Sequence, residues 1–229
     1  MKLQHYIDNH TELSIKYLIG GKYMETLRFG FRGTEVSNLQ HKLVVMGYYT
    51  TRVDGIYGNN TVAAVKKFQS DNGISADGVY GPTSDKYMNK YKFYSMNNGD
   101  KKISKNFDLH EFACKDGNPL LVIDEEFIIN KLQNIRDHFG KPITINSAYR
   151  TVSHNAKPSV GGSKGSLHLR GRAFDIYVKG VSQNEVAKYA VSIGIPGVIR
   201  YNGFVHVDSR CKTYRAINNN GKVTVVNGF

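Results

Sequence analysis

Residues 166–175 have the sequence S-L-H-L-R-G-R-A-F-D, and this stretch says more about fold and chemistry than any other part of the chain. From residue 172 to residue 178, large apolar side chains occupy every second position, which predicts a strand. Phe174, Ile176 and Val178 form its apolar face. Asp175 therefore lies on the opposite face and points away from the apolar side.

A second strand is predicted over residues 204–209, where the same alternation places two valines on one face and His206 and Asp208 on the other. His168 precedes the first strand in a segment whose glycines allow the backbone to bend. Its imidazole can then approach both strands. Three side chains of metal-ligand type, His168, Asp175 and His206, are thus predicted to come together.

Two imidazoles and one carboxylate match the ligand sets of catalytic zinc sites, which keep a fourth position for water. The spacing alone leaves a second interpretation open. In that interpretation Asp175 is an ion-pair partner at a strand edge, and His168 and His206 are ordinary polar residues.

The complete pattern, S-x-H-x-x-G-x-A-x-D followed by V-H-V-D, closely resembles the M15 family of zinc D,D-peptidases, which cleave the peptide stems of bacterial peptidoglycan. Further motifs follow the family order: F-D-L-H-E-F at 107–112, S-A-Y-R-T at 147–151, H-N at 154–155 and V-G-G at 160–162. The resemblance covers nearly all of residues 103–210. It implies a peptidase domain over 103–229, with Zn²⁺ held by His168, Asp175 and His206.

The resemblance also assigns roles around the metal. Arg150 corresponds to the substrate-orienting arginine of the family, and a guanidinium there suits a developing oxyanion or a substrate carboxylate. The alternative for Arg150 is a structural salt bridge. Ser147, His154 and Asn155 are expected to shape the substrate-binding cleft.

The general base departs from the family pattern. Many members place a glutamate three residues before the last histidine ligand, or a histidine two residues before it, and here Gly203 and Phe204 occupy those positions. Asp208 shares a strand face with His206. We therefore expect Asp208 to act as the base or to orient a ligand imidazole.

Other signals define the rest of this domain. A helix capped by Asp124 is predicted to end at Gly140, followed by a strand over 143–149 that delivers Arg150. A capping box, S-x-x-E, begins a second helix at residue 182. Strands over 197–201 and 204–209 suggest a hairpin. Helices with mainly antiparallel strands indicate an α+β domain.

A motif repeats within residues 27–90: D-G-I-Y-G-N-N-T at 54–61 and D-G-V-Y-G-P-T-S at 77–84. Each copy predicts a glycine turn that leads into a helix, and with one earlier helix they form a small all-α three-helix domain. This domain resembles the peptidoglycan-binding modules of wall hydrolases. Tyr57 and Tyr80 are candidate contacts for sugars or stem peptides, unless each packs its own turn.

Residues 1–26 are interpreted as an N-terminal extension and residues 91–102, with N-N-G, as a linker. The first ten residues lack the apolar core and cleavage site of a signal peptide. We therefore expect a protein made in the cytoplasm that acts on the cell wall after release, as phage endolysins do.

The charge of the chain limits the classes of binding partner. The net charge is +12, and residues after 90 carry 20 Lys/Arg against 11 Asp/Glu. No nucleic-acid-binding motif accompanies this charge, so we expect no nucleic acid and favour anionic wall polymers as additional partners. The sequence contains no run of about eighteen apolar residues, so we expect no transmembrane helix. We expect a monomer. Cys114 and Cys211 lack metal or redox spacing, which predicts two thiols and leaves a disulfide open.

The function predicted from the sequence is zinc-dependent cleavage of peptidoglycan stems, of the D-Ala-D-Ala carboxypeptidase or the L-Ala-D-Glu endopeptidase type, by a phage-type endolysin. A non-catalytic wall-binding protein with a structural zinc site is the alternative.

Overall fold

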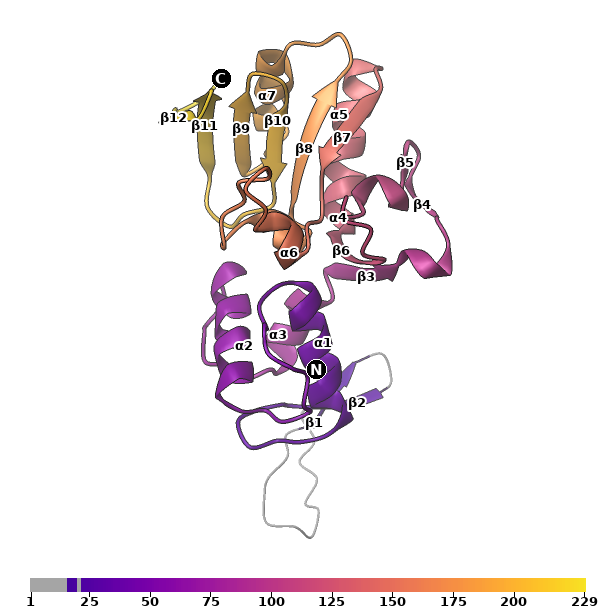
Figure 1. Ribbon diagram of the computed structural model, residues 1–229, viewed down its shortest axis with the longest axis vertical. Helices are drawn as coiled ribbons and strands as arrows, with labels where there is room; N and C mark the ends of the chain where they lie inside the picture. Colours follow the sequence, from indigo (N-terminus) through magenta and orange to yellow (C-terminus); the bar gives the residue numbers. More distant parts are fainter. Residues whose placement is uncertain (1–15, 20–21) are drawn as a thin grey trace. The chain divides into compact units, whose positions relative to one another are not determined.

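The computed structural model describes residues 16–19 and 22–229 (Figure 1). The chain divides into two compact units, the first ending at Asn89 and the second comprising Lys90–Phe229 together with Val45–Gly47. The extension predicted over residues 1–26 is described only in part. Within it, β1 (Lys16–Ile19) and β2 (Lys22–Glu25) pair as an antiparallel hairpin. Residues 1–15 and 20–21 of the predicted extension lie outside the described residues.

Three helices form the first unit: α1 (Thr34–Val45), α2 (Asn59–Asp71) and α3 (Pro82–Met88). This confirms the predicted three-helix domain. Their apolar faces share one core, whose buried side chains include Val36, Leu39, Leu43, Val65, Phe68 and Met88. Pro82 stands at the start of α3, where a helix leaves the backbone N–H without an intrahelical acceptor in any case.

Each of the two repeated turns is held by a buried glutamine of the preceding helix. The Gln40 amide donates to Asp54 Oδ1 at 2.8 Å, and its own oxygen accepts from the N–H of the turn glycine at 2.9 Å. Gln69 makes the equivalent pair of bonds one repeat later, with Asp77 Oδ1 at 2.8 Å and the next turn glycine at 2.9 Å. The repeat in sequence is therefore a repeat in hydrogen bonding.

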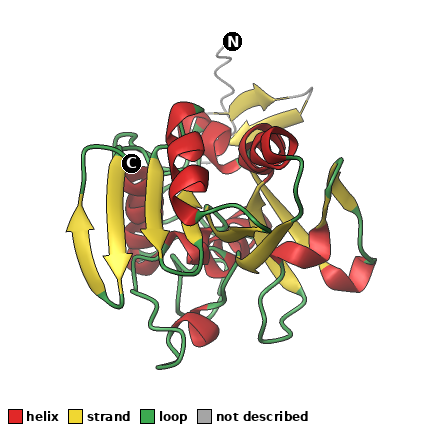
Figure 2. Cartoon of the chain, turned by 90° about the horizontal axis from the view of Figure 1, so that it is seen from above, coloured by secondary structure: helices red, strands yellow, loops and turns green. Residues whose placement is uncertain are grey.

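A six-stranded sheet with the order β12-β11-β9-β10-β8-β7 is the centre of the second unit. Its strands are β7 (Ile143–Ser147), β8 (Ala173–Val178), β9 (Gly197–Tyr201), β10 (Val205–Asp208), β11 (Tyr214–Asn219) and β12 (Lys222–Val225). Neighbours are antiparallel except β9 and β11, which are parallel. Figure 2 shows strands of this sheet side by side in yellow. The predicted α+β class and the β9–β10 hairpin are confirmed.

Two helical segments of this unit are long: the run α4 (Glu125–Phe127), π-helical η3 (Ile128–Leu132) and α5 (Gln133–Phe139), and the helix α7 (Gln183–Ser192). The first three follow one another without a break. Asp124 begins them by accepting from the backbone of Phe127 at 3.2 Å, and Gly140 ends them in the left-handed region at φ 58°. Helix α7 packs against β8, β9 and β10 and contacts α5.

The predicted linker over residues 91–102 is wrong for most of its length. β3 (Tyr91–Ser95) pairs antiparallel with β6 (Leu120–Asp124), a short 3-10 turn η1 (Met96–Asn98) follows, and β4 (Lys102–Ser104) pairs with β5 (Phe107–Asp108). The physical reason is that the apolar strand β6 needs a hydrogen-bonded neighbour, and β3 supplies it with Tyr91 buried. Among residues 16–19 and 22–229, no helix is both long enough and apolar enough to cross a membrane.

Packing and strand register determine where the site residues lie. The 3-10 helix η4 (Leu167–Arg170) carries His168 and ends at Gly171, which has φ +64°. A Cβ on Gly171 would lie 2.0 Å from the carbonyl oxygen of Val122, so only glycine fits. In the sheet, His206 of β10 stands directly opposite Asp175 of β8.

Candidate metal centre

His168, Asp175 and His206 meet at one carboxylate oxygen. Asp175 Oδ1 lies 2.8 Å from His206 Nδ1 and 3.3 Å from His168 Nε2. Their ligand atoms all lie within 4.8 Å of one another, and the two imidazoles are 5.1 Å apart between ring centroids. The structure therefore brings together the three residues that the sequence singled out, two from neighbouring strands and one from η4.

The far side of each imidazole is held by a hydrogen-bond acceptor. His168 Nδ1 lies 2.7 Å from the carbonyl oxygen of Ala148, and His206 Nε2 lies 3.0 Å from Asp208 Oδ2. These acceptors keep the ring proton of a neutral histidine on the outer nitrogen, so the inner nitrogens can present lone pairs toward Asp175. Two such nitrogens and one carboxylate oxygen, each oriented by a second residue, fit a zinc ion.

Asp208 is held on several sides. Its side chain is fully buried, and Arg210 donates through Nε to Asp208 Oδ1 at 2.8 Å and to Oδ2 at 3.0 Å. On another side it lies against Gly197, where an added Cβ would be 2.0 Å from Asp208 Oδ1. A carboxylate this enclosed favours the orienting role over the role of a general base.

The charges of the metal-free site follow from these contacts. Burial alone would lower the pKa of His206, but its hydrogen bonds with Asp175 and Asp208 outweigh burial and raise that pKa to about 9. Burial likewise opposes ionisation of Asp175, yet the neighbouring His168 and His206 hold the pKa of this carboxyl well below its usual range. For His168, burial dominates and lowers the pKa. The metal-free site thus holds the ionised carboxylate of Asp175 and a proton on His206. A bound cation would displace this proton.

Arg150 follows β7 and touches the same carboxylate from outside. Its Nη2 lies 2.8 Å from Asp175 Oδ2, its Nε donates to Ser147 Oγ at 2.7 Å, and its backbone N–H donates to the carbonyl of His168 at 3.1 Å. Arg150 thereby occupies the carboxylate oxygen that the histidines leave. Ser147 lies at the site through this hydrogen bond. The ion pair that the sequence left open is present, and a role in orienting substrate stays a prediction.

Two predicted substrate contacts are corrected in the first unit. Tyr57 is fully buried and donates its hydroxyl to the carbonyl of Gly78 at 2.9 Å, while Tyr80 is 4% exposed and donates to Asp85 Oδ1 at 3.1 Å. Neither ring is accessible for stacking on a sugar. Tyr57 instead connects the first repeated turn to the second, and Tyr80 bonds to the helix that follows its own turn.

Two further predicted cleft residues make other contacts, and their role in the cleft stays a prediction. Asn155, in α6 (Val152–Asn155), is 4% exposed and donates to the carbonyl of Ser163 at 2.9 Å, so it holds the following loop. A Cβ on Gly162 would lie 2.0 Å from its Oδ1, which shows how closely that loop packs on the amide. His154 belongs to a different cluster, with Cys114 and Asp116.

The sequence did not reveal Ala148, Gly197 and Arg210 as supports of the site. Arg210 had a usable signal, because continued alternation after β10 places it on the same side as Asp208. The other two act through the backbone, and a carbonyl oxygen or a missing Cβ leaves no chemical signature in a sequence.

Two family models match the chain. The model described as Peptidase M15 matches residues 105–208, and the model described as putative peptidoglycan binding domain matches residues 32–83. The two matches fall in different units. The Peptidase M15 match includes all three residues of the metal cluster.

Individual relatives agree with these matches. The zinc D-Ala-D-Ala carboxypeptidase of Streptomyces albus G is 32% identical over 206 residues, which cover 80% of this chain and 74% of that protein. The peptidoglycan L,D-endopeptidase MepK of Escherichia coli (strain K12) is 34% identical over 44% of this chain and 58% of its own length. A probable N-acetylmuramoyl-L-alanine amidase of Bacillus licheniformis is 35% identical over 42% of this chain and 26% of its own. The first similarity extends over both units.

Proposed function

This chain belongs to the M15 family of zinc peptidases and is a zinc-dependent peptidoglycan hydrolase, and from this premise we propose that it cleaves the D-alanyl-D-alanine bond of stem peptides as a carboxypeptidase. The observation that carries the proposal is the convergence of His168, Asp175 and His206 on one oxygen, with Arg150 beside them. The choice of bond is supported by the relative that is similar over 80% of the chain.

Zinc held by these three residues would supply a Lewis acid for the scissile carbonyl and would lower the pKa of water enough for attack near neutral pH. The chain itself supplies orientation and charge. Ala148 and Asp208 hold the two imidazoles by their outer nitrogens. Arg150 places a positive charge next to the site, where it can stabilise negative charge that develops on the substrate.

Proton transfer is assigned differently from the pattern of the family. Asp208 is enclosed by Arg210 and by the backbone at Gly197. We therefore assign to Asp208 the role of orienting His206 and not that of removing a proton. Asp175 is engaged by both histidines and by Arg150. The proposal therefore assigns the general base to neither Asp175 nor Asp208.

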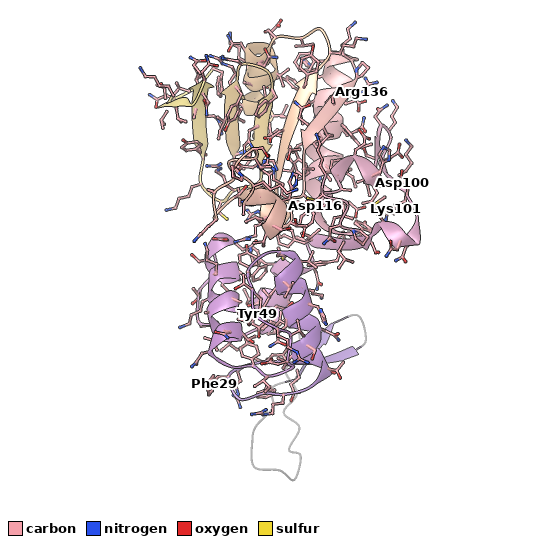
Figure 3. All side chains as sticks on the ribbon, viewed as in Figure 1. Phe29, Tyr49, Asp100, Lys101, Asp116 and Arg136 are labelled. Carbon is pink, nitrogen blue, oxygen red and sulfur yellow. The ribbon has the colours of Figure 1, made fainter. Side chains whose placement is uncertain are left out.

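The test is mass spectrometry of purified peptidoglycan and of a synthetic stem pentapeptide after digestion. The samples are wild-type protein with zinc, chelated wild-type protein, and His168→Ala. His110→Ala is the matched control, because this histidine is exposed and pairs with Asp100 away from the metal cluster (Asp100 is labelled in Figure 3). We expect D-alanine to be released by wild type and by the control, and not by the other two.

Each alternative predicts a different product. New amino termini on D-glutamate would show that the enzyme is an L-Ala-D-Glu endopeptidase and not a carboxypeptidase. This result would leave the assignment of the zinc site unchanged. Absence of any cleavage, with binding to peptidoglycan retained, would support a non-catalytic wall-binding protein with a structural zinc.

We also propose that the protein works as a phage-type endolysin, made in the cytoplasm and acting on the wall after release. This role requires that the enzyme also cleave a stem-peptide bond that holds the wall together, because removal of a terminal D-alanine leaves the cross-links of the wall intact. The support is the combination of a peptidoglycan-binding unit with a wall peptidase in one chain. Lysis of cells when the protein is added from outside, lost in His168→Ala, is the expected result. Digestion of purified wall without lysis of any intact cell would contradict it.

A further inference from the structure

A second cluster of metal-ligand side chains lies in the peptidase unit and shares no residue with the first metal cluster. Cys114 and Asp116 come from the loop after η2 (Leu109–Phe112), and His154 comes from α6. One ligand atom of each lies within 4.8 Å of the others. Asp116 is labelled in Figure 3.

We propose that Cys114, Asp116 and His154 form a second metal site, for a borderline-soft divalent cation of the zinc class. The ligand types decide the metal. A cysteine sulfur excludes magnesium and calcium, which prefer oxygen, while sulfur, imidazole and carboxylate together are a common zinc set. Bond lengths of about 2.0–2.3 Å place donors roughly 3–4 Å apart around zinc, so the observed spread needs only a small contraction.

The imidazole of His154 gives independent support. Its Nδ1 is buried, and within the described part of the chain it has no hydrogen-bond partner. Buried polar atoms are normally hydrogen-bonded, so an exception points to a missing ligand or water. A metal ion bound at this cluster would give the His154 imidazole a partner that the described part of the protein does not provide.

Thr151 already holds the two segments of the cluster together. Its backbone N–H donates to Cys114 Sγ at 3.4 Å, and its hydroxyl donates to Asp116 Oδ2. The hydroxyl oxygen of Thr151 also accepts from the N–H of His154 at 3.1 Å. The ligands are therefore preorganised without metal. Thr151 also follows Arg150 directly, so a cation here would brace the segment that carries this arginine.

The alternative of a cysteine nucleophile is disfavoured by the surroundings of the sulfur. Burial raises the pKa of the Cys114 thiol, and a protonated, buried thiol is a poor nucleophile. Cation binding would instead convert it to the thiolate. This site differs from the catalytic cluster in containing sulfur, which provides a specific spectroscopic test.

The experiment uses the full chain, stripped of metal and reloaded with Co²⁺ or Zn²⁺. We expect about two metal ions per chain by elemental analysis, and a sulfur-to-cobalt charge-transfer band in the near ultraviolet. Cys114→Ser and His154→Ala should each lower the content to about one ion and remove the band. His168→Ala should also bind about one ion but keep the band, because it loses only the catalytic site.

Cys211→Ser is the matched control, since this cysteine is exposed and lies outside the cluster. It should keep both ions and the band. The proposal is overturned if wild type binds a single ion without the band, or if the band is lost in Cys211→Ser and kept in Cys114→Ser. Circular dichroism checks folding, and if Cys114→Ser does not fold, His154→Ala decides the outcome.

Discussion

Replacing Asp208 by asparagine separates the two roles that a carboxylate beside a zinc ligand can have. In the structure Asp208 accepts from His206 Nε2 at 3.0 Å and is held by Arg210. Asparagine keeps the size and one acceptor oxygen, but it loses the negative charge and turns an N–H group toward one of its two partners. The expected result is weaker zinc binding with the fold retained.

The size of the effect follows from the contacts. Loss of a hydrogen-bonding partner behind a metal ligand typically costs 10–100-fold in metal affinity, which corresponds to about 1.4–2.7 kcal/mol. Because Asp208 is fully buried against Arg210, the metal-free protein should also lose about 1–3 kcal/mol in free energy of unfolding. Turnover at saturating zinc should change far less than zinc affinity.

The assay is competition with a chromophoric zinc chelator at fixed pH and ionic strength, followed by turnover at saturating zinc. Glu126→Gln, which removes an exposed carboxylate at the start of the α4 helix, is the matched control and should leave both quantities unchanged. A general base would behave in the opposite way, with turnover lowered about 10²–10⁴-fold and zinc affinity equal to wild type. That result would refute the orienting role.

Three other perturbations have definite expected outcomes. Gln40→Ala removes the amide that holds Asp54 and the first repeated turn, so thermal unfolding should report a loss of about 2–4 kcal/mol in the first unit; an unchanged melting temperature would contradict the role of this glutamine. Arg150→Lys keeps the positive charge but loses the forked guanidinium that binds Ser147 and Asp175, so kcat on stem peptides should fall about 10²–10³-fold with zinc still bound. A kcat equal to that of the wild type would contradict a role for Arg150 in the reaction. The pKa of His206 is raised to about 9 in the metal-free protein, so below that pH zinc must displace a proton from this histidine. The apparent zinc affinity, measured from about pH 6.5 to 8, should therefore rise roughly tenfold per pH unit. A flat profile would be inconsistent with His206 as a ligand.

The catalytic cluster was predictable from the sequence because strand alternation carries directional information. Once β8 and β10 are recognised, period two places Asp175 and His206 on polar faces, and antiparallel pairing brings them opposite each other. The glycine turns and the helix boundary at Gly140 were predictable for a similar reason. Each depends on backbone conformations that few residues adopt.

Contacts between distant segments without a sequence period were not predictable. Gln40 and Gln69 are polar residues on amphipathic helices, and only the folded turns show that they are buried. Cys114 and His154 lie 40 residues apart with no motif spacing, and the loop geometry at Thr151 brings them together. Tyr91 was assigned to a linker because its partner strand, β6, begins only at Leu120.

The most direct test of the metal centre is an anomalous difference map of crystals grown with zinc, recorded above and below the zinc absorption edge. We expect a peak bonded to His168 Nε2, Asp175 Oδ1 and His206 Nδ1, at distances of about 2.0–2.2 Å. A fully loaded, active crystal with no zinc at these three atoms would contradict this expectation.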